Sequence, residues 1–377
     1  MRRLLLSIVV ALILVSLGVV VQSQAPEPIV IGCNLEMTGQ VAAYGQAAWE
    51  GINIVSQIVK PEVLGRPVKF VPLDNKSDKI DTANAASRLI ERDNVVAIIG
   101  PMISGSMLAA GEVCEKKEVP IIGPTTTNPL TTQDKKYVFR ACFIDPFQAT
   151  IAATYCYRDL NAKTAAILSD ISNDYCVALG NFFQQEFERL GGKVVSLTYC
   201  KAGDQDYSAQ LTDVKTKNPD IIYIPNYYTE AALAVVQARD LGLKQPVFGA
   251  DGIATEEFLA IGGKAVEGVM HTTFWHEKAA ESELSKKYVE LYRAKYGAED
   301  EVNVFGALAA DCYLIILDAI ERAGSTDPKK IAEAIEATKN LQVVTGSVTI
   351  ENGDAIKPVV FREVKGGKWD YKTMVYP

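Results

Sequence analysis

The sequence predicts an α/β protein built from two lobes, each a doubly wound parallel sheet. Short apolar runs alternate with amphipathic helical patterns along most of the 377 residues, in two successive series. A continuous apolar strand is typical of a parallel sheet that helices cover on both faces. A chain of this length is too long for one small core, so the two series indicate two lobes.

The first series fills the N-terminal part of the chain. Its expected strands are 28–33, 67–74, 95–100 and 119–124, and its expected helices are 44–59, 82–92 and one that begins near Ser104. The next apolar run, 135–147, shows no helix pattern of its own. We therefore expect this run to be a strand that crosses from the first lobe to the second.

The second series shows the same alternation of expected strands and helices as the first. Its expected strands are 164–170, 193–200, 220–225 and 246–251, with helices after Tyr175, from about Ser208 and from Thr229. Two long helices follow at 281–296 and 306–323, and residues 346–370 show an antiparallel pattern. Helices that follow a complete second sheet are expected to pack back on the first lobe. The lobes would then be joined by a hinge of several strands.

Domain boundaries follow from these crossings. We expect residues 27–143 and 277–345 to form the N-terminal lobe. The C-terminal lobe is expected to comprise residues 144–276 and 346–377.

Residues 1–25 are expected to be a secretory signal peptide. Two arginines precede an apolar run over 4–21, and small residues stand at Ser23 and Ala25, the two positions that a signal peptidase reads. The run is long enough to span a bilayer, so an uncleaved anchor remains an alternative. The polar, proline-containing segment that follows favours cleavage after Ala25.

Charge and composition restrict the partners. Loss of residues 1–25 removes two positive charges, so the formal charge moves from −8 to −10. An acidic surface without a Lys/Arg block argues against binding to nucleic acid or to an anionic membrane surface. No cysteine stands near the cleavage point to accept a lipid, so we expect a soluble periplasmic protein.

The seven cysteines form no recognisable metal or redox motif. No two of them are spaced as CxxC, which excludes zinc-ribbon and thioredoxin-like sites. Export permits disulfides, but an odd number leaves at least one thiol unpaired within the chain. We interpret most of them as small buried hydrophobes. They are Cys33, Cys114, Cys142, Cys156, Cys176, Cys200 and Cys312.

The ends of the expected strands carry the candidate site, because ligands of open parallel sheets bind at the carboxyl ends of the strands. In the first lobe one strand leads into Ser104-Gly105-Ser106 and another into Thr125-Thr126-Thr127. In the second lobe the strand ends offer Tyr175, the pair Tyr227-Tyr228, and Asp251. Hydroxyls and helix-start amides suit an anion, whereas aromatic rings and a carboxylate suit a cation. A zwitterionic amino acid would bridge the two sets.

Each of these residues also has an ordinary structural interpretation. Ser104 and Ser106 could be plain helix N-caps, and 125–127 could be a turn. The aromatic pair could be half-buried at a strand end, and Asp251 before a glycine could be another turn. Their joint placement, with opposite polarity in the two lobes, is what favours a binding site.

Several blocks of the chain resemble a known family. They are "LEMTGQVAAYGQAAWEGINI", "IIGPMISGSM", "VPIIGPTTTNP", "NDYCVALGNFF" and "IPNYYTEAALAVVQARDLGLKQPVFGADG". In this order they resemble the branched-chain amino acid binding proteins, which are periplasmic substrate-binding components of ABC transporters with the type I periplasmic-binding fold. The resemblance runs from about Ile29 to the C-terminus.

The resemblance implies roles for the polar strand ends. Ser104 and Thr127 would hold the α-carboxylate of the ligand with their hydroxyls and amides, and Thr126 would add a main-chain contact. Asp251 would hold the α-ammonium group, where the family's leucine/isoleucine/valine binders carry Glu.

The resemblance also implies an aromatic enclosure and a set of partners. Tyr175 and Tyr227 would close over the ligand, and Tyr44 would line the pocket for its side chain. The partners would be the amino acid and a membrane permease, with the binding protein acting as a monomer without cofactor or metal.

Three positions depart from the family pattern. Ile103 stands where one cysteine of the family's N-lobe disulfide would be, so that disulfide has no counterpart. Cys176 replaces the glycine that usually follows Tyr175. Asp251 is one methylene shorter than Glu, so the ligand would sit deeper or differ in size.

Other functions remain alternatives on the sequence alone. An enzyme is disfavoured, because no GxSxG, Walker A or GxGxxG motif follows a strand. The two histidines, His271 and His276, are separated by an odd number within or beside one strand and so do not form a metal pair. A binder of amides or urea from the same family, and a sensor that presents its ligand to a chemoreceptor, both stay open.

Overall fold

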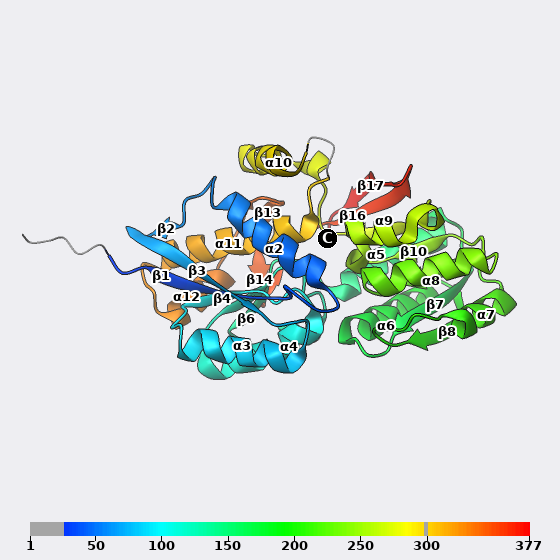
Figure 1. Ribbon diagram of the computed structural model, residues 1–377, viewed down its shortest axis with the longest axis horizontal. Coiled ribbons are helices and arrows are strands. Elements are labelled where there is room, and N and C mark those ends of the chain that lie inside the picture. The colour runs from blue at the N-terminus through cyan, green and yellow to red at the C-terminus, as the bar shows by residue number, and fades with distance from the viewer. Residues whose placement is uncertain (1–25, 298–300) are drawn as a thin grey trace, which may run out of the picture.

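The computed structural model describes residues 26–297 and 301–377, which form two α/β lobes side by side along the long axis (Figure 1). The expected signal peptide, residues 1–25, lies outside the described residues. Among the residues described, no helix is both long enough and apolar enough to cross a membrane.

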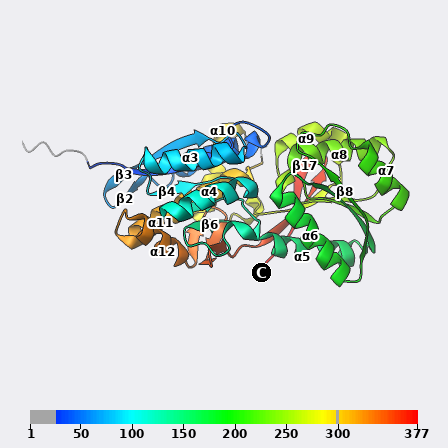
Figure 2. The ribbon, with the colours of Figure 1, turned by 90° about the horizontal axis from the view of Figure 1, so that it is seen from below.

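The N-terminal lobe contains a six-stranded sheet in the order β2-β3-β1-β4-β5-β6. All neighbours pair in parallel except the short β2–β3 hairpin. Helices cover both faces: α3 packs with α4 on one, and α2 with α11 on the other (Figures 1 and 2). The elements are β1 Ile29–Leu35, α2 Ala42–Val55, β2 Glu62–Val63, β3 Arg66–Asp74, α3 Lys79–Glu91, β4 Ala97–Ile99, α4 Ser104–Lys117, β5 Ile121–Gly123, β6 Val138–Arg140 and α11 Val304–Ala323.

The C-terminal lobe contains a seven-stranded sheet in the order β17-β16-β11-β10-β9-β7-β8. Five strands run parallel, and β16 and β17 add an antiparallel edge. The two doubly wound lobes predicted from the sequence are therefore confirmed. The elements are α5 Asp145–Thr154, β7 Thr164–Asp170, α6 Asp174–Arg189, β8 Lys193–Cys200, α7 Ser208–Lys217, β9 Ile221–Ile224, α8 Tyr228–Asp240, β10 Val247–Gly249, α9 Glu256–Gly262, β11 Met270–Thr273, β16 Val359–Lys365 and β17 Lys368–Val375.

Three segments join the lobes: between β6 and α5, between β11 and α10 (Glu283–Tyr296), and ahead of β16. The last crossing comes later than the expected boundary at residue 345. The hairpin of β14 (Ile350–Glu351) and β15 (Asp354–Ala355) still packs on the N-terminal lobe, where the Arg140 amide donates to the Gly353 carbonyl at 2.9 Å. We therefore propose that the third boundary lies at residues 356–358.

Three helices were not predicted from the sequence: the short α9 (Glu256–Gly262) and two longer helices, α5 and α12. The run 135–147 does not lack a helix, because α5 begins at Asp145 and packs against α6 in the C-terminal lobe. Helix α12 (Pro328–Glu336) follows α11 in the N-terminal lobe. Both begin with a proline in the first turn. Proline fits there because the first amide of a helix has no intrahelical acceptor, but in a sequence it resembles a helix breaker.

All seven cysteines lie in the described part of the chain, and each is buried and unpaired. The interpretation of most of them as small buried hydrophobes is therefore confirmed.

Helices α2 and α11 pack backbone to backbone at a pair of glycines. A Cβ atom added at Gly51 would lie 1.9 Å from the carbonyl oxygen of Gly306, a contact that no flexible side chain could relieve. In contrast, a Cβ added at Gly180 in α6 would meet its neighbours at 3.7 Å, an ordinary van der Waals distance.

We predict that Gly51→Ala lowers the free energy of unfolding by about 1–3 kcal/mol, the usual cost of overpacking a core. Gly180→Ala is the matched control, and we expect it to be neutral or to stabilise by up to about 1 kcal/mol, because alanine restricts the unfolded chain. Urea unfolding of both variants measures the difference. Equal stability of the two variants would contradict the close packing of α2 on α11.

Candidate functional site

The carboxyl ends of both sheets meet at a small cavity between the lobes. The cavity is narrow: the centre of a water-sized sphere has only about 10 Å³ available to it. Its wall contains residues from both lobes: Tyr44, Met102, Ile103, Ser104, Thr125, Tyr175, Tyr227, Asp251, Gly252 and Phe305. Five of the seven residues predicted from the sequence line it, namely Tyr44, Ser104, Tyr175, Tyr227 and Asp251. The other two, Thr126 and Thr127, are buried in the turn directly after Thr125.

Ser104 does not cap helix α4. Ile103 occupies the N-cap position and its side chain makes no capping hydrogen bond, so Ser104 is the first helical residue. The Ser104 hydroxyl instead accepts a hydrogen bond from the Asn128 amide at 3.2 Å, which ties the start of α4 to the threonine turn. The plain N-cap interpretation of Ser104 is therefore wrong, and its hydroxyl is left at the cavity wall.

Most hydrogen-bond donors of the threonine turn, residues 125–127, have no acceptor among the described residues. The Thr125 hydroxyl donates to the Met102 carbonyl at 2.7 Å. The buried hydroxyl of Thr126 has no partner among the described residues, and that of Thr127 has only the neighbouring Asp145 carboxyl, to which it makes no well-formed hydrogen bond. The amides of all three threonines likewise donate to no described residue. Because an unsatisfied buried donor is costly, such a group of donors in one turn indicates an anion site.

Four helices that begin near the cleft lack a side-chain cap: α4, α5, α6 and α8. Helix α11, whose Phe305 lines the cavity, is instead capped by Asn303. Helices α3, α10 and α12, by comparison, are capped by Asp78, Ser282 and Asp327. An uncapped helix N-terminus exposes amides and the positive end of the helix dipole, which suits a ligand with negative charge.

The opposite wall of the cavity is set by Asp251, which follows β10 and is 4% exposed. Its Oδ1 accepts hydrogen bonds from Gln148 Nε2 at 2.7 Å and from the Tyr175 hydroxyl at 2.9 Å. Its Oδ2 has no hydrogen-bond partner among the described residues. Burial raises the pKa of Asp251 to about 6, although the two donors act in the opposite direction. The hydrogen-bond partners of the Asp251 carboxylate are neutral, so a ligand could supply the positive charge that would pair with it.

A second carboxylate, Asp145, lies behind this wall and was not predicted from the sequence. It is fully buried at the start of α5, and neither of its oxygens makes a well-formed hydrogen bond with a described residue. Burial, followed by the negative charge of Asp251, raises the pKa of Asp145 well above its ordinary value. The available signal was an acidic residue in the run that crosses between the lobes.

Gln148, from the same helix, connects the hinge to this wall. Its amide oxygen accepts from the Asp251 amide at 3.2 Å and from the Thr272 hydroxyl at 2.5 Å. Gln148 therefore positions both the backbone and the side chain of Asp251. No sequence pattern marks it, because its partners lie over 100 residues away.

Aromatic rings form the remaining walls. The rings of Tyr175 and Tyr227 are parallel, with centroids 5.4 Å apart. Tyr44 stacks on Phe305 at 4.2 Å and meets the edge of Tyr227 at 5.8 Å. Phe305, from the start of α11, was not assigned to the site from the sequence, because this helix enters the lobe from a distant part of the chain.

The two lobes touch across the cleft, so the structure represents a closed conformation. The Tyr44 hydroxyl donates to the Gly252 carbonyl. Nearer the surface, Gln40 Nε2 contacts Glu230 Oε1 at 3.0 Å, and Lys79 Nζ lies 2.6 Å from Asp174 Oδ2. All three contacts join residues of different lobes.

A two-lobed protein that closes on a small, charge-lined cavity is a solute-binding protein of the type I periplasmic-binding fold. Residues 28–368 match the family model described as "Periplasmic binding protein". The chain belongs to this family, in the branch of the Leu/Ile/Val-binding proteins, which are the substrate-binding components of ABC transporters.

Individual relatives are similar to this chain over almost its whole length. A leucine-binding protein LivK from Thermotoga maritima is 45% identical, with a TM-score of 0.90 over 93% of this chain and 99% of that one. The LivJ protein of Streptococcus pneumoniae, solved in complex with isoleucine, is 30% identical with a TM-score of 0.87 over 93% and 100%. A leucine-, isoleucine-, valine-, threonine- and alanine-binding protein of Pseudomonas aeruginosa is 29% identical over 88% of each chain.

The burial of Asp251 predicts a stability that depends on pH. Its folded pKa, about 6, is above the ordinary value of 3.8, so the folded state prefers the protonated form. The stabilisation by this proton is complete below about pH 4 and is lost as the pH rises through 6. In ligand-free protein at pH 7, Asp251→Asn should therefore raise the free energy of unfolding by about 1–3 kcal/mol.

Urea unfolding of wild type and Asp251→Asn at pH 4.5 and pH 7 provides the measurement. The gain should be larger at pH 7, because asparagine keeps the acceptor for Gln148 and Tyr175 without the buried charge. A variant that is less stable than wild type at pH 7 would show that the charge is compensated within the protein itself.

Proposed function

We propose that this protein captures a free branched-chain amino acid between its lobes and delivers it to the permease of an ABC transporter. The observation that supports this most strongly is the polarity of the cavity. One lobe contributes hydroxyls and unused amides, and the other contributes the carboxylate of Asp251. A zwitterion would satisfy both walls at once, because each charged end would find its opposite.

The ligand's α-carboxylate would lie on Ser104, on the amides of residues 125–127 and on the Thr127 hydroxyl. Thr126 would contribute its backbone only, because its hydroxyl points back to within 2.3 Å of where a Cβ of Gly123 would lie. The α-ammonium group would lie on Asp251 Oδ2. Asp145, whose pKa burial raises well above its ordinary value, would add a second polar neighbour.

The remaining lining favours an apolar side chain. Met102, Ile103 and Phe305 contribute apolar surface, and Tyr44 and Tyr227 present ring faces and edges. Apart from Asp251, no charged side chain lines the cavity among the described residues. A charged ligand side chain would therefore find no partner, whereas leucine, isoleucine or valine would bury apolar area.

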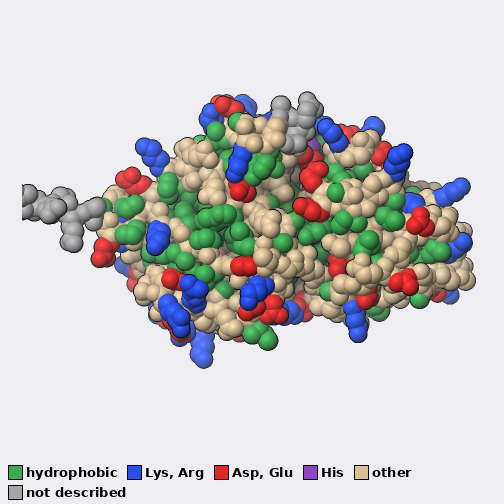
Figure 3. Space-filling model, viewed as in Figure 1, with side chains coloured by type: hydrophobic (Ala, Val, Ile, Leu, Met, Phe, Trp, Pro, Cys, Tyr) green, Lys and Arg blue, Asp and Glu red, His purple; other side chains and the backbone are tan. Residues whose placement is uncertain are grey.

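The relatives named above support the same ligand class and a location outside the cytoplasm. We propose that the chain is exported by its N-terminal segment, that it acts as a monomer and that it is not an enzyme. The two histidines, His271 and His276, do not line the cavity. Figure 3 shows Lys/Arg and Asp/Glu side chains interspersed over the visible face, which gives a polyanion such as nucleic acid no continuous basic surface.

We predict that leucine, isoleucine or valine raises the melting temperature of protein that has been unfolded, stripped of ligand and refolded. A ligand that binds only the folded state stabilises it by about 2.7 kcal/mol at a hundredfold excess over its dissociation constant. A thermal-shift screen of the twenty amino acids and of small amides tests this. The amino acid proposal fails if no amino acid shifts the transition, and a shift by amides alone would assign the protein to amide binders.

We predict that Asp251→Ala weakens binding of the best amino acid by about 2–5 kcal/mol, because the ammonium group loses its only opposite charge. Isothermal titration calorimetry measures the loss. Asp170→Ala is a matched control: Asp170 is also a buried carboxylate at a strand end of this lobe, but it hydrogen bonds Ser172 and does not line the cavity. A loss below about 1 kcal/mol for Asp251→Ala, the size of one neutral hydrogen bond, would place the ammonium site elsewhere.

A further inference from the structure

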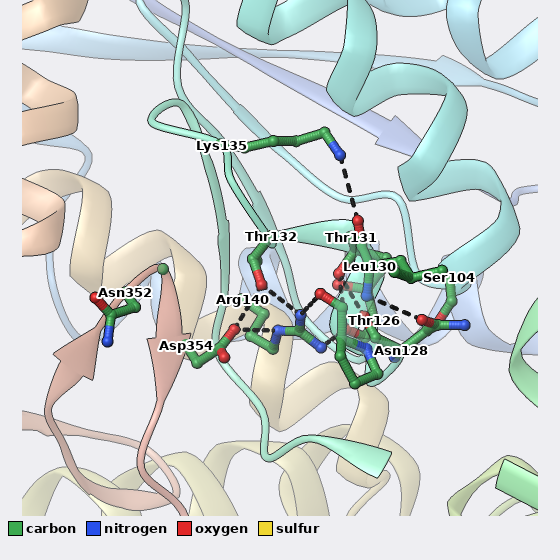
Figure 4. A network of polar contacts seen from close by, with 12 residues as sticks. Ser104, Thr126, Asn128, Leu130, Thr131, Thr132, Lys135, Arg140, Asn352 and Asp354 are labelled. Atoms are coloured by element: carbon green, nitrogen blue, oxygen red, sulfur yellow. Dashed lines mark hydrogen bonds and ion pairs between the residues drawn. The ribbon is translucent and has the colours of Figure 1, made fainter. Parts of the chain in front are cut away.

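Arg140, at the end of β6, is completely buried behind the threonine turn. Its guanidinium group donates to the Thr126 carbonyl at 2.8 Å, to the Pro129 carbonyl at 3.3 Å and to the Thr132 hydroxyl at 2.5 Å (Figure 4). It does not line the cavity and does not reach a ligand there. One side chain therefore fixes several points along residues 126–132.

The contact with Thr126 determines which way an amide points. In a trans peptide the carbonyl of one residue and the amide of the next point in opposite directions. Because Arg140 holds the Thr126 carbonyl on its own side, the Thr127 amide is directed away from it. The Thr127–Asn128 peptide is held from both sides in the same way. The Thr127 carbonyl accepts from the Asp145 amide at 2.9 Å, while the Asn128 amide donates to the Ser104 hydroxyl.

Arg140 is itself held by a distant hairpin. Its Nε lies 2.7 Å from Asp354 Oδ1 in the β14–β15 hairpin, and the same oxygen accepts from the Thr132 hydroxyl at 2.7 Å. The hairpin is fixed in turn by Glu336, which accepts from the amides of Asn352 and Gly353. Figure 4 shows Asp354 and Arg140 next to each other, with the threonine turn on the far side of the guanidinium group.

We propose that Arg140, oriented by Asp354, is a positioning residue of the anion site: it fixes the Thr126–Thr127 peptide so that the Thr127 amide meets the carboxylate of the ligand. This inference rests on the proposed amino acid function. The planar guanidinium group of Arg140 is required because it carries several N–H donors in a fixed fork. Lysine offers a single ammonium group and cannot hold three acceptors in this geometry at once. The buried charge thus acts through the backbone of the turn and does not touch the ligand.

The test compares L-leucine with L-leucinamide, which has the same ammonium group and side chain but no carboxylate charge. Their dissociation constants are measured by calorimetry for wild type, Arg140→Lys and Asp354→Asn. We expect both variants to weaken leucine binding by about 10-fold or more, the size of a charge-assisted hydrogen bond. Leucinamide binding should change little, so the ratio of the dissociation constants of leucinamide and leucine should fall towards one. Asp354→Asn keeps the acceptor for Thr132 and is the milder variant if Arg140→Lys does not fold.

Arg362→Lys is the matched control. Arg362 is a buried arginine of the C-terminal lobe, 2.5 Å from Glu301 and outside the cavity wall. It should lower stability yet leave the preference for leucine over leucinamide unchanged.

The outcomes separate this inference from the proposed function. Wild-type protein that binds leucinamide as tightly as leucine, or that binds no branched-chain amino acid, would overturn the proposed function. If wild type prefers leucine but Arg140→Lys and Asp354→Asn retain that preference, Arg140 is not a positioning residue. An equal loss for both ligands in the two variants would also overturn the inference, since it would indicate a purely structural role.

Discussion

The buried charge of Asp251 is the constraint on which the organisation of this cleft depends. A carboxylate removed from water needs a positive partner, and the described residues supply only neutral donors, Gln148 and Tyr175, to one of its oxygens. The protein therefore carries an unfavourable electrostatic state until a cation enters. The charge of Asp251 also acts on a neighbouring carboxyl, Asp145, whose pKa is raised well above its ordinary value by burial and then by this repulsion. Under the proposed function, the ammonium group of the ligand would relieve this unfavourable state.

The doubly wound topology brings uncapped helix N-termini to the cleft. Parallel strands deliver helix N-termini to the same edge, where α4 of the N-terminal lobe has no side-chain cap, and neither have α5, α6 and α8 of the C-terminal lobe. Unused amides cost little while they are hydrated in an open cleft, but they require an acceptor once the lobes close. The alternation of parallel strands and helices that builds the sheet thus also provides amides that would receive the carboxylate end of a zwitterion under the proposed function.

The exposed ion pair between the lobes contributes little to closure. The Lys79–Asp174 pair has side chains 56% and 39% exposed, and such exposed pairs contribute about 0–1 kcal/mol each. A ligand that satisfies Asp251 on one lobe and the threonine turn on the other supplies a larger difference between open and closed states. Three crossing segments allow the lobes to rotate while each sheet stays intact, as in other hinge-closing proteins.

The sequence by itself predicted the two lobes and half of the residues that line the cavity, and its resemblance to a family predicted the class of protein. Apolar strands, helix periods and turn residues are local patterns, so they placed Ser104, Tyr175 and Asp251 beyond the ends of strands, where the structure also has them. Only the tertiary structure decided that Thr126 turns its hydroxyl away, that α5 begins at Asp145, and that residues 346–355 stay with the N-terminal lobe. The pairs Gln148–Asp251 and Arg140–Asp354 join residues more than 100 positions apart, and no local pattern encodes such a contact. Their geometry comes from how the packed sheets bring distant strand ends together.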